Sequence, residues 1–509
     1  MKKVGIIIAL VSLLLTAGCQ EENPTENITN QPVPDYTSME EEPVLAYEVP
    51  VSIPGILVNQ IGYITGSTKV AIFHGEELPD VFYVVKAESG KTVYTGTLEE
   101  KKTAPNETIS YCYGDFSEVT TAGTYYIEAP ILGRTYEFKI GENVYGDLFA
   151  EACKQYYYNR CGMTLTENYA GENAHNACHT AKAVLQSDTS VSVDVTGGWH
   201  QDEKGQKNTL AAAETMSMLL LAYELYPDAF SDDTGIPESG NGIPDILDEI
   251  KYEADWLLKM QEQETGAVYE GVSVYAKNGD AASKVANIYV EPPTADAGKA
   301  FAMALAKFSY LYQNYDTAYA TNCLKAADRA WKYVELNNKD KIMDEWSFAA
   351  ATELYRASGK LSYHQYVTQY LQSEDYKNQW NETILLGYVT YISTKHRVNK
   401  VHCEMIMDLI MTKAENISYT AREAVYLTAG NKQQDNNNQL LLEMMCLSVV
   451  NRIISNHEYE TVIENHLHYF LGRNETAHNH IENSTGIMKQ FEADGKLVLM
   501  LSEIMKNGR

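Results

Sequence analysis

The chain changes character near residue 145, and this change constrains the fold more than any other feature. From about Ile53 to Ile140, short segments rich in β-branched and aromatic residues, such as Val81–Val85 and Gly123–Ile127, alternate with turn clusters. Such a series of strands predicts a small β-sandwich. From Tyr145 onward, long segments rich in Ala, Leu, Met and Lys have helical spacing. We expect about a dozen helices without intervening strands, in a helical barrel or an array of helical pairs.

The charge balance disfavours one class of partner. Lys and Arg number 40 against 69 Asp and Glu, so the formal net charge is −29. Such a field repels phosphate backbones and anionic bilayers, and we therefore expect no nucleic-acid partner. The 37 tyrosines suit a surface that binds polar ligands, but they also serve as ordinary packing, so composition does not choose between these roles.

The N-terminus has the pattern of an export signal. Lys2 and Lys3 precede the apolar run Val4–Leu15, which is too short to span a bilayer, and small residues then lead to Cys19. Small residues directly before a cysteine resemble the lipobox of bacterial lipoproteins, and plain secretion is the alternative. We predict a signal peptide over residues 1–18, lipidation at Cys19 and an extracellular protein held at the cell membrane by its lipid anchor only. Residues 19–50 lack apolar periodicity and predict a disordered linker.

Three side chains with metal-ligand chemistry lie in one loop region after the predicted sandwich. Cys161 and Cys178 are separated by sixteen residues, and His179 follows the second cysteine directly. Two thiolates and an imidazole suit tetrahedral zinc, and His200 and His175 are candidates for the fourth ligand. A disulfide and free thiols are the alternatives. The remaining cysteines are widely scattered, which does not predict a disulfide framework.

Three stretches are specific enough to indicate a family. The first is Ile56–Tyr63, with the sequence Ile-Leu-Val-Asn-Gln-Ile-Gly-Tyr, and the second is Asp194–His200, with the sequence Asp-Val-Thr-Gly-Gly-Trp-His. The third runs over Ile236–Glu249 and precedes Trp256–Gln261. Together these stretches resemble glycoside hydrolase family 9, and the first resembles the opening strand of the immunoglobulin-like module that precedes many bacterial cellulases. The resemblance spans roughly residues 54–475.

This resemblance implies an immunoglobulin-like β-sandwich over residues 51–142, followed by an (α/α)6 barrel of the catalytic type over residues 143–509. It implies a glycosidase of the cellulase or endoglucanase type, acting on β-1,4-glucan or a related polysaccharide or oligosaccharide by inverting hydrolysis. It also supports a structural zinc held by Cys161, Cys178, His179 and a further histidine. Family members often carry calcium, and Ser231–Glu249 is our candidate for such a site; the alternative is that this segment only ends one helix and starts the next.

The loop after Trp199 departs from the family pattern. Relatives carry Asp-Ala-Gly-Asp at the positions of Gln201-Asp202-Glu203-Lys204, so Gln201 and Lys204 replace both aspartates. Inversion requires one carboxylate to activate water and a second carboxyl to protonate the leaving oxygen. A glutamine accepts no proton usefully, and a lysine would need a strongly lowered pKa. We therefore predict Asp202 or Glu203 as the base, with Trp199 and His200 in substrate binding.

The C-terminal segment, where relatives carry the glutamate that acts as the acid, also departs from the family pattern. Glu492, just before the last predicted helix near Leu497–Lys506, is the predicted acid, and Glu482 is second; the alternative for each is a solvated charge. Three functions stay open: a glycosidase acting on β-1,4-glucan, a hydrolase of changed specificity, and a catalytically degenerate carbohydrate-binding lipoprotein of the same fold. Two carboxyls facing each other across a groove would favour an enzyme. Lys204 pointing into that groove, with Asp202 and Glu203 facing solvent, would favour a binding protein.

Overall fold

The structure is a computed structural model, and it describes residues 53–103, 109–275, 287–337, 343–373, 379–430, 436–482 and 486–506. The predicted signal peptide, Cys19 and the predicted linker lie outside these residues. None of the described helices combines the length and the hydropathy needed to cross a bilayer.

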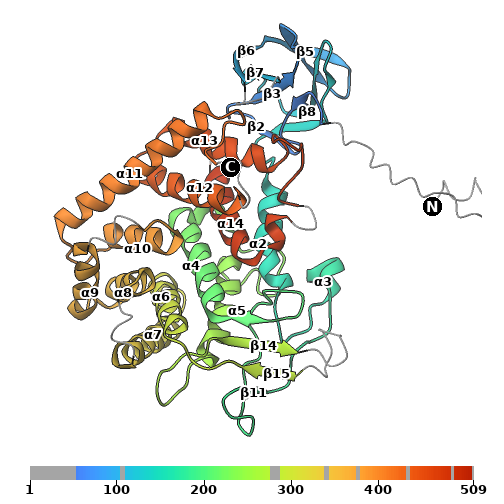
Figure 1. The fold of residues 1–509 in the computed structure, drawn as a ribbon. Helices are drawn as coiled ribbons and strands as arrows, with labels where there is room; N and C mark the ends of the chain where they lie inside the picture. The colour runs from blue at the N-terminus through green and yellow to red at the C-terminus, as the bar shows by residue number, and fades with distance from the viewer. Residues whose placement is uncertain are drawn as a thin grey trace, which may run out of the picture. The chain divides into compact units, whose positions relative to one another are not determined.

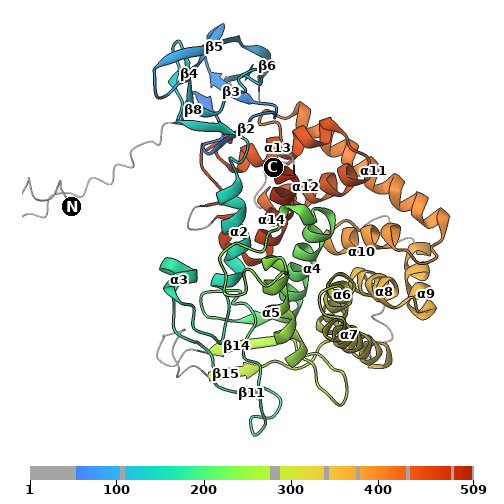
Figure 2. The same cartoon turned by 180° about the vertical axis from the view of Figure 1, so that it is seen from behind.

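Two sheets form the predicted β-sandwich (Figures 1 and 2). The first has the order β1 (Ile56–Leu57), β3 (Val70–Gly75), β7 (Ser110–Asp115) and β6 (Glu99–Thr103). The second has the order β2 (Gly62–Ile64), β10 (Phe138–Gly141), β8 (Gly123–Ala129), β4 (Val81–Lys86) and β5 (Lys91–Thr97), and β9 (Gly133–Arg134) pairs with β8. Inward-facing side chains such as Phe73, Phe82 and Ile127 fill the space between the sheets. The immunoglobulin-like sandwich is therefore confirmed.

The helices pair into two rings. Their members are α2 (Gly146–Tyr158), α4 (Thr209–Leu225), α5 (Asp245–Lys259), α6 (Ala295–Tyr312), α7 (Thr317–Asn337), α8 (Glu345–Ser358), α9 (Leu361–Gln372), α10 (Glu382–Ser393), α11 (Lys400–Glu423), α12 (Asn436–Ile453), α13 (His457–Phe470) and α14 (Phe491–Met505), and the short helix α3 (Glu167–Ala170) belongs to neither ring. Consecutive contacts run from α4 through α6, α8, α10, α12 and α14 back to α4, which closes an inner ring of six helices. Each inner helix packs against an outer partner, namely α5, α7, α9, α11, α13 and α2. This arrangement confirms the predicted (α/α)6 barrel.

The expectation of helices without intervening strands was wrong. A five-stranded sheet with the order β12 (Ser192–Val193), β11 (Ala183–Leu185), β15 (Asn287–Val290), β14 (Gly271–Tyr275) and β13 (Lys207–Asn208) lies among the helices. These strands are two to five residues long, too short to show a period-two pattern in the sequence. The last helix also begins earlier than predicted, at Phe491. The strand β13 leads directly into α4, so this sheet anchors the loop that follows Trp199.

The motif Ile56–Tyr63 joins the sandwich to the barrel. The side-chain amide of Asn59 donates a hydrogen bond of 3.0 Å to the Tyr145 hydroxyl and lies 2.9 Å from Nδ1 of the buried His468. The backbone amide of Gln60 donates to the carbonyl of Leu471 at 2.9 Å. This sequence motif is therefore explained by contacts between the two parts of the chain.

Candidate functional site

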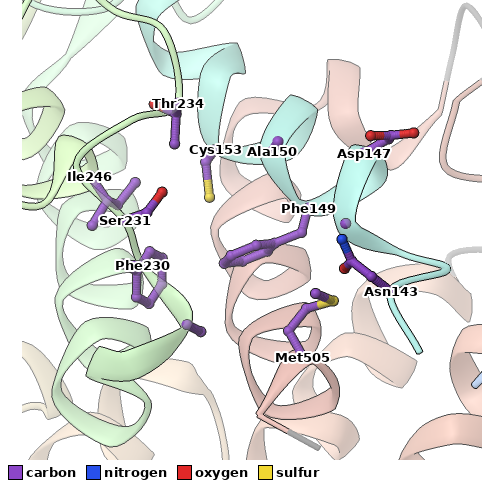
Figure 3. A pocket seen from close by; sticks show the side chains of 12 residues that line it. Asn143, Asp147, Phe149, Ala150, Cys153, Phe230, Ser231, Thr234, Ile246 and Met505 are labelled. Carbon is purple, nitrogen blue, oxygen red and sulfur yellow. The ribbon is translucent and has the colours of Figure 1, made fainter. Parts of the chain in front are cut away.

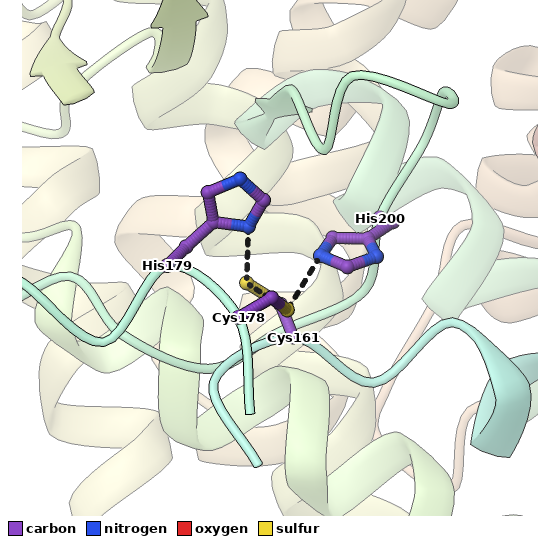
Figure 4. A group of neighbouring side chains, drawn as sticks. All are labelled: Cys161, Cys178, His179 and His200. Atoms are coloured by element: carbon purple, nitrogen blue, oxygen red, sulfur yellow. Dashed lines mark hydrogen bonds between the residues drawn. The ribbon is translucent and has the colours of Figure 1, made fainter. Parts of the chain in front are cut away.

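Two cysteines and two histidines converge beside α5 (Figure 4). One ligand atom from each of Cys161, Cys178, His179 and His200 lies within 4.8 Å of every other. The Cys161 and Cys178 sulfurs are 4.0 Å apart, Cys161 Sγ is 3.6 Å from His179 Nδ1, and Cys178 Sγ is 3.3 Å from His200 Nε2. His200, which we predicted as a substrate-binding residue and as one candidate fourth ligand, lies in this cluster. His175, the other candidate, lies outside it, with its ring 6.4 Å from that of His200.

The spacing of these atoms fits a tetrahedral metal site. A zinc ion with Zn–S bonds of about 2.3 Å and Zn–N bonds of about 2.0 Å places its sulfurs about 3.8 Å apart and each sulfur about 3.5 Å from a ligand nitrogen. The observed distances lie within a few tenths of an ångström of these values. A disulfide would need the two sulfurs at about half their observed separation. Hydrogen bonding with Cys161 lowers the pKa of the Cys178 thiol, which favours the thiolate that binds a metal.

The backbone around the cluster is constrained on both sides. His179 has a φ of +45°, which is strained for a residue with a side chain. The Cys161 amide donates to the Gly198 carbonyl at 2.8 Å, and the His200 amide donates to the Asn159 carbonyl at 2.7 Å. A Cβ atom at Gly205 would lie 2.5 Å from the His179 ring, so glycine is required where the altered loop passes this ligand.

A buried charge network begins at Arg160, next to Cys161 in the chain, and we did not predict it from the sequence. The Arg160 guanidinium pairs with Glu238 at 2.9 Å and with Glu249 at 2.9 Å. Glu253 accepts the backbone N–H of Trp199 at 2.6 Å. Burial raises the pKa of Glu249 to about 7 and that of Glu253 to about 8, against the opposing effects of nearby cations. The local signal was weak, because Arg160 and Glu249 lie 89 positions apart in the chain.

Lys207 links this network to the cluster of two cysteines and two histidines. Its ammonium group lies 3.7 Å from Cys161 Sγ and donates to the carbonyl of Gly197 at 2.6 Å. Burial lowers the pKa of Lys207, while the Cys161 thiol and Glu253 oppose that effect. Hydrogen bonding with Cys178 and burial raise the pKa of the Cys161 thiol, and the Lys207 cation opposes that rise.

The loop after Trp199 is held by its own hydrogen bonds. The Gln201 side chain donates to the Asn208 carbonyl at 2.8 Å and accepts the Asn208 amide at 2.7 Å. Asp202 Oδ1 accepts the Lys204 amide at 3.0 Å and the Gln206 amide at 2.9 Å, and Oδ2 accepts the Gln206 side-chain amide at 2.9 Å. Asp202, Glu203 and Lys204 are all exposed. The structure thus places the two predicted bases at the surface, with the Asp202 carboxylate closing a turn.

The structure places Trp199 in the core. Its side chain has no exposed surface, and its ring packs against Tyr156 and Phe491 at centroid distances of 4.8 and 6.0 Å. A fully buried ring offers no face to a dissolved sugar, so in this conformation Trp199 positions the loop and the start of α14 rather than a ligand.

A small pocket opens beside Gln201. It has a volume of about 190 Å³ and is lined by Gln201, Ala211, Asn438, Gln490, Phe491 and Ala493. We call it the Gln201 pocket. Its polar side chains are amides, and an aromatic ring closes one side. Glu492 lies in the first turn of α14 next to this pocket, but its side chain lies outside the described part of the chain, and Glu482 is exposed and accepts the Asn479 side-chain amide at 2.7 Å.

Two further carboxylates lie near the start of α4 and were not predicted as site residues. Glu270 accepts the Asn208 side-chain amide at 3.3 Å and the Thr294 hydroxyl, and Glu291 accepts the Ser273 hydroxyl. They come from the ends of β14 and β15, where the short strands left no signal. Their hydroxyl partners satisfy one oxygen of each carboxylate.

The candidate calcium segment folds on itself. Asp245 Oδ2 accepts the amide and hydroxyl of Thr234, both at 2.6 Å, and the Ser239 hydroxyl at 2.7 Å. Asp232 accepts the amides of Gly240 and Gly242 at 2.7 Å each. These contacts explain how the segment ends one helix and leads into α5, and calcium at this position stays a prediction.

Comparison with known proteins agrees with this architecture. Residues 145–485 match the model of glycosyl hydrolase family 9, and residues 52–134 match that of the cellulase N-terminal immunoglobulin-like domain. Endoglucanase D of Acetivibrio thermocellus is 30% identical over 82% of this chain and 71% of its own length. The cellodextrinase of Butyrivibrio fibrisolvens is 28% identical over 82% of this chain and 83% of its own length. These relatives support the prediction of a glycosidase.

Two solved structures extend the comparison. A metagenome-derived family 9 endoglucanase superposes with a TM-score of 0.80 at 24% identity and covers 89% of this chain and 99% of its own, which shows the shared fold. A Zn-binding triple mutant of a family 9 endoglucanase superposes with a TM-score of 0.73 at 26% identity and covers 81% of this chain and 82% of its own. Sequence and fold together show that the chain belongs to glycosyl hydrolase family 9.

Proposed function

We propose that the protein is a glycosidase that cleaves a β-1,4-linked glucan or a related polysaccharide with inversion. Its kinship with endoglucanases and a cellodextrinase, over four fifths of the chain, is the observation that carries the proposal. Under this proposal Asp202 or Glu203 activates water, and Glu492 protonates the leaving oxygen across a gap of about 6.5–9.5 Å. Asp202 would have to exchange its three loop hydrogen bonds for a water molecule, and we expect slow turnover for that reason.

Reducing-sugar release from soluble β-1,4-glucan tests this proposal. We expect the purified chain to release sugar, Glu492→Gln to abolish release, and either Asp202→Asn or Glu203→Gln to lower it by at least about a hundredfold. Asp188→Asn is a matched control, because Asp188 is an exposed carboxylate that also closes its own turn, through Ser190. Release that is unchanged in all three site variants would contradict the assignment of these residues.

One observation favours a second function, binding of the same glucan without cleavage. Gln201, at the position of a family aspartate, is bonded through both ends of its amide to the backbone of Asn208, and the neighbouring carboxylates are exposed. An amide in that place binds sugar hydroxyls but takes up no proton at neutral pH. No release on a broad polysaccharide panel, together with retention on a glucan gel, would establish this second function in place of the first.

We also propose that the four-residue cluster holds one structural zinc ion. The support is the tetrahedral spacing of its atoms, with His179 Nδ1 at 3.6 Å from Cys161 Sγ and His200 Nε2 at 3.3 Å from Cys178 Sγ. Metal analysis should find about one equivalent in the purified protein and none in Cys178→Ser. Cys323→Ser is the control, because that buried cysteine lies outside the cluster. Metal-free protein purified without chelators would reject the proposal.

We further propose that the chain is exported and lipidated at Cys19, which tethers it to the outer face of a bacterial membrane. The support is the basic, apolar and small-residue order of the first nineteen positions. Mass spectrometry of the protein expressed in a bacterial host should detect a diacyl modification on Cys19, and Cys19→Ala should release the protein from the membrane fraction. A soluble wild-type protein with an unmodified Cys19 would contradict it.

A further inference from the structure

Three pockets follow one another along the segment Leu225–Ser231, which leaves the C-terminal end of α4. The first has a volume of about 490 Å³, the second about 460 Å³ and the third about 230 Å³. The first and second share Pro227 as a lining residue, and the second and third share Ala229. Because each shared residue borders two pockets, the three pockets adjoin one another along this segment, and we call this row of pockets the α4-end groove.

This groove lies far from the Gln201 pocket. Ala211 lines the Gln201 pocket and Tyr223 lines the first pocket of the α4-end groove, and both residues belong to α4. Twelve residues of α-helix separate them, which corresponds to about 18 Å along the helix axis. The α4-end groove is therefore a separate feature at the opposite end of the inner ring.

Tyrosine rings form the walls of its first pocket. Tyr315 has 37% of its surface exposed, and its hydroxyl lies 2.7 Å from that of Tyr223. The Tyr310 ring is held by the guanidinium of Arg356, which lies 4.5 Å from the ring centroid. Rings fixed in this way offer rigid flat faces at low entropic cost, and such faces match the apolar C–H side of a pyranose ring.

The polar groups of the first pocket suit a ligand rich in hydroxyl groups. Gln313 and Asn314 contribute exposed amides that both donate and accept hydrogen bonds. The one carboxylate in the lining, Glu224, is neutralised by ion pairs with Lys307 at 2.8 Å and with Arg356. The exposed Lys395 also lines the pocket, and its ammonium group donates hydrogen bonds to hydroxyls as the amides do.

The other two pockets continue the same chemistry. The second is lined by Tyr226, Asn451 and Ser455, and its Lys506 lies 3.5 Å from carboxylates on Glu460 and Glu503. In the third, the rings of Phe149 and Phe230 and the sulfur of Cys153 face the cavity, with Asn143, Ser231 and Thr234 around them (Figure 3). Both pockets therefore combine largely buried aromatic rings with polar and charged side chains, among them Asp228 in the second pocket and Asp147 in the third.

We infer that the α4-end groove is a second carbohydrate-binding site, which holds an extended, uncharged β-1,4-linked glucan chain away from the Gln201 pocket. The net charge of −29 disfavours polyanionic sugars, and the row of three pockets suits a chain of several rings better than a single sugar. The class of sugar rests on the proposed function, and the location rests on the groove itself.

Titration calorimetry with an S-linked cellopentaose, which resists hydrolysis, tests this inference on the full chain. We expect two sites per chain for the wild type. In Tyr315→Ala the affinity of one site should fall at least about tenfold, because an anchoring ring is lost. Tyr315→Phe keeps the ring and should stay within about threefold of the wild type. Tyr419→Ala removes a tyrosine that is 61% exposed on α11 and should change nothing.

Binding at a single site that Tyr315→Ala leaves unchanged would overturn the inference, and so would the absence of binding. Loss of the same site in both Tyr315→Ala and Tyr419→Ala would also overturn it, because a remote tyrosine would then matter equally. The sugar-release assay tests the proposed cleavage independently of the binding measured by calorimetry. A protein that releases no sugar but shows the Tyr315-dependent site would refute cleavage and keep the second site.

Discussion

Replacement of Arg160 by methionine tests whether the buried charge network holds the metal-binding loop in place. The side chains of Arg160 and Glu249 are 1% and 2% exposed, and the guanidinium also pairs with Glu238. It stacks over Tyr252, with its carbon 4.6 Å from the ring centroid. Methionine keeps most of the apolar contact but leaves Glu249 buried without its cation. Breaking one partner out of a buried pair costs about 3–5 kcal/mol.

The cost depends on pH, and its sign follows from Glu249. Burial raises the pKa of this carboxyl to about 7 in the folded chain, against an ordinary value of 4.5. Because the pKa of Glu249 is higher in the folded chain than in the unfolded chain, the protonated carboxyl favours folding. Its contribution to the free energy of unfolding is complete below pH 4.5 and is lost as the pH rises through about 7. Without Arg160 the folded pKa rises further. We therefore expect Arg160→Met to lose about 3–5 kcal/mol at pH 8 and about 1–3 kcal/mol at pH 5.5, where Glu249 takes up a proton.

Urea unfolding at both pH values measures the two losses, and zinc content measured on the same samples shows whether the neighbouring Cys161 still binds metal. In a Glu249→Gln background position 249 no longer titrates, so adding Arg160→Met to Glu249→Gln should cost the same at pH 5.5 and pH 8. Equal losses for Arg160→Met alone at the two pH values would refute the reasoning. A double variant as pH-dependent as the single one would refute it as well, because the titrating group would then be another residue.

Three further outcomes follow from the same contacts. Gly205→Ala should destabilise the fold by about 1–2 kcal/mol and weaken zinc binding in a chelator competition, because the new Cβ meets the His179 ring. Gly90→Ala is the control: this residue is also left-handed but has open space around it, so its replacement should show only the backbone cost. Lys307→Met should cost about 3–5 kcal/mol in urea unfolding, since this cation is 1% exposed between two carboxylates, whereas the exposed Lys400→Met should cost under about 1 kcal/mol. Burial would raise the pKa of Glu224, but Lys307 and Arg356 lower it to about 2. The contribution of this carboxylate to the free energy of unfolding should therefore be complete above pH 4.5 and vanish as the pH falls toward 2. Urea unfolding of Glu224→Gln should show a smaller decline over this pH range.

The large elements of the fold were predictable because their signals are local. Strands of six or seven residues and helices of up to 24 residues repeat their apolar positions often enough to show a period. The strands β11 to β15 did not, because two to five residues complete at most two periods. The pairing of helices into inner and outer rings also lay beyond local pattern. The family resemblance supplied it.

The four residues of the cysteine–histidine cluster divide in the same way. Cys161, Cys178 and His179 were predictable from ligand type and spacing, since all three lie within one loop region. The choice between His200 and His175 was not, because both lie within reach along the chain and only the tertiary arrangement brings His200 Nε2 to 3.3 Å from Cys178. The contact between Arg160 and Glu249 crosses 89 positions, so neither residue carried a local sign of the other.

The loop after Trp199 shows why a sequence change at a reactive position is hard to interpret without geometry. Gln201 both donates to and accepts from the backbone of Asn208, the residue that caps α4. An ionised aspartate has no proton to donate and a shorter side chain, so it cannot make both bonds. The amide therefore stabilises the start of α4, while Gly205 in the same loop packs under the His179 ring. A loop held at one end by its bonds to the helix cap and packed at the other against the His179 ring keeps its shape without a carboxylate at position 201, so the fold does not depend on an acid at this position.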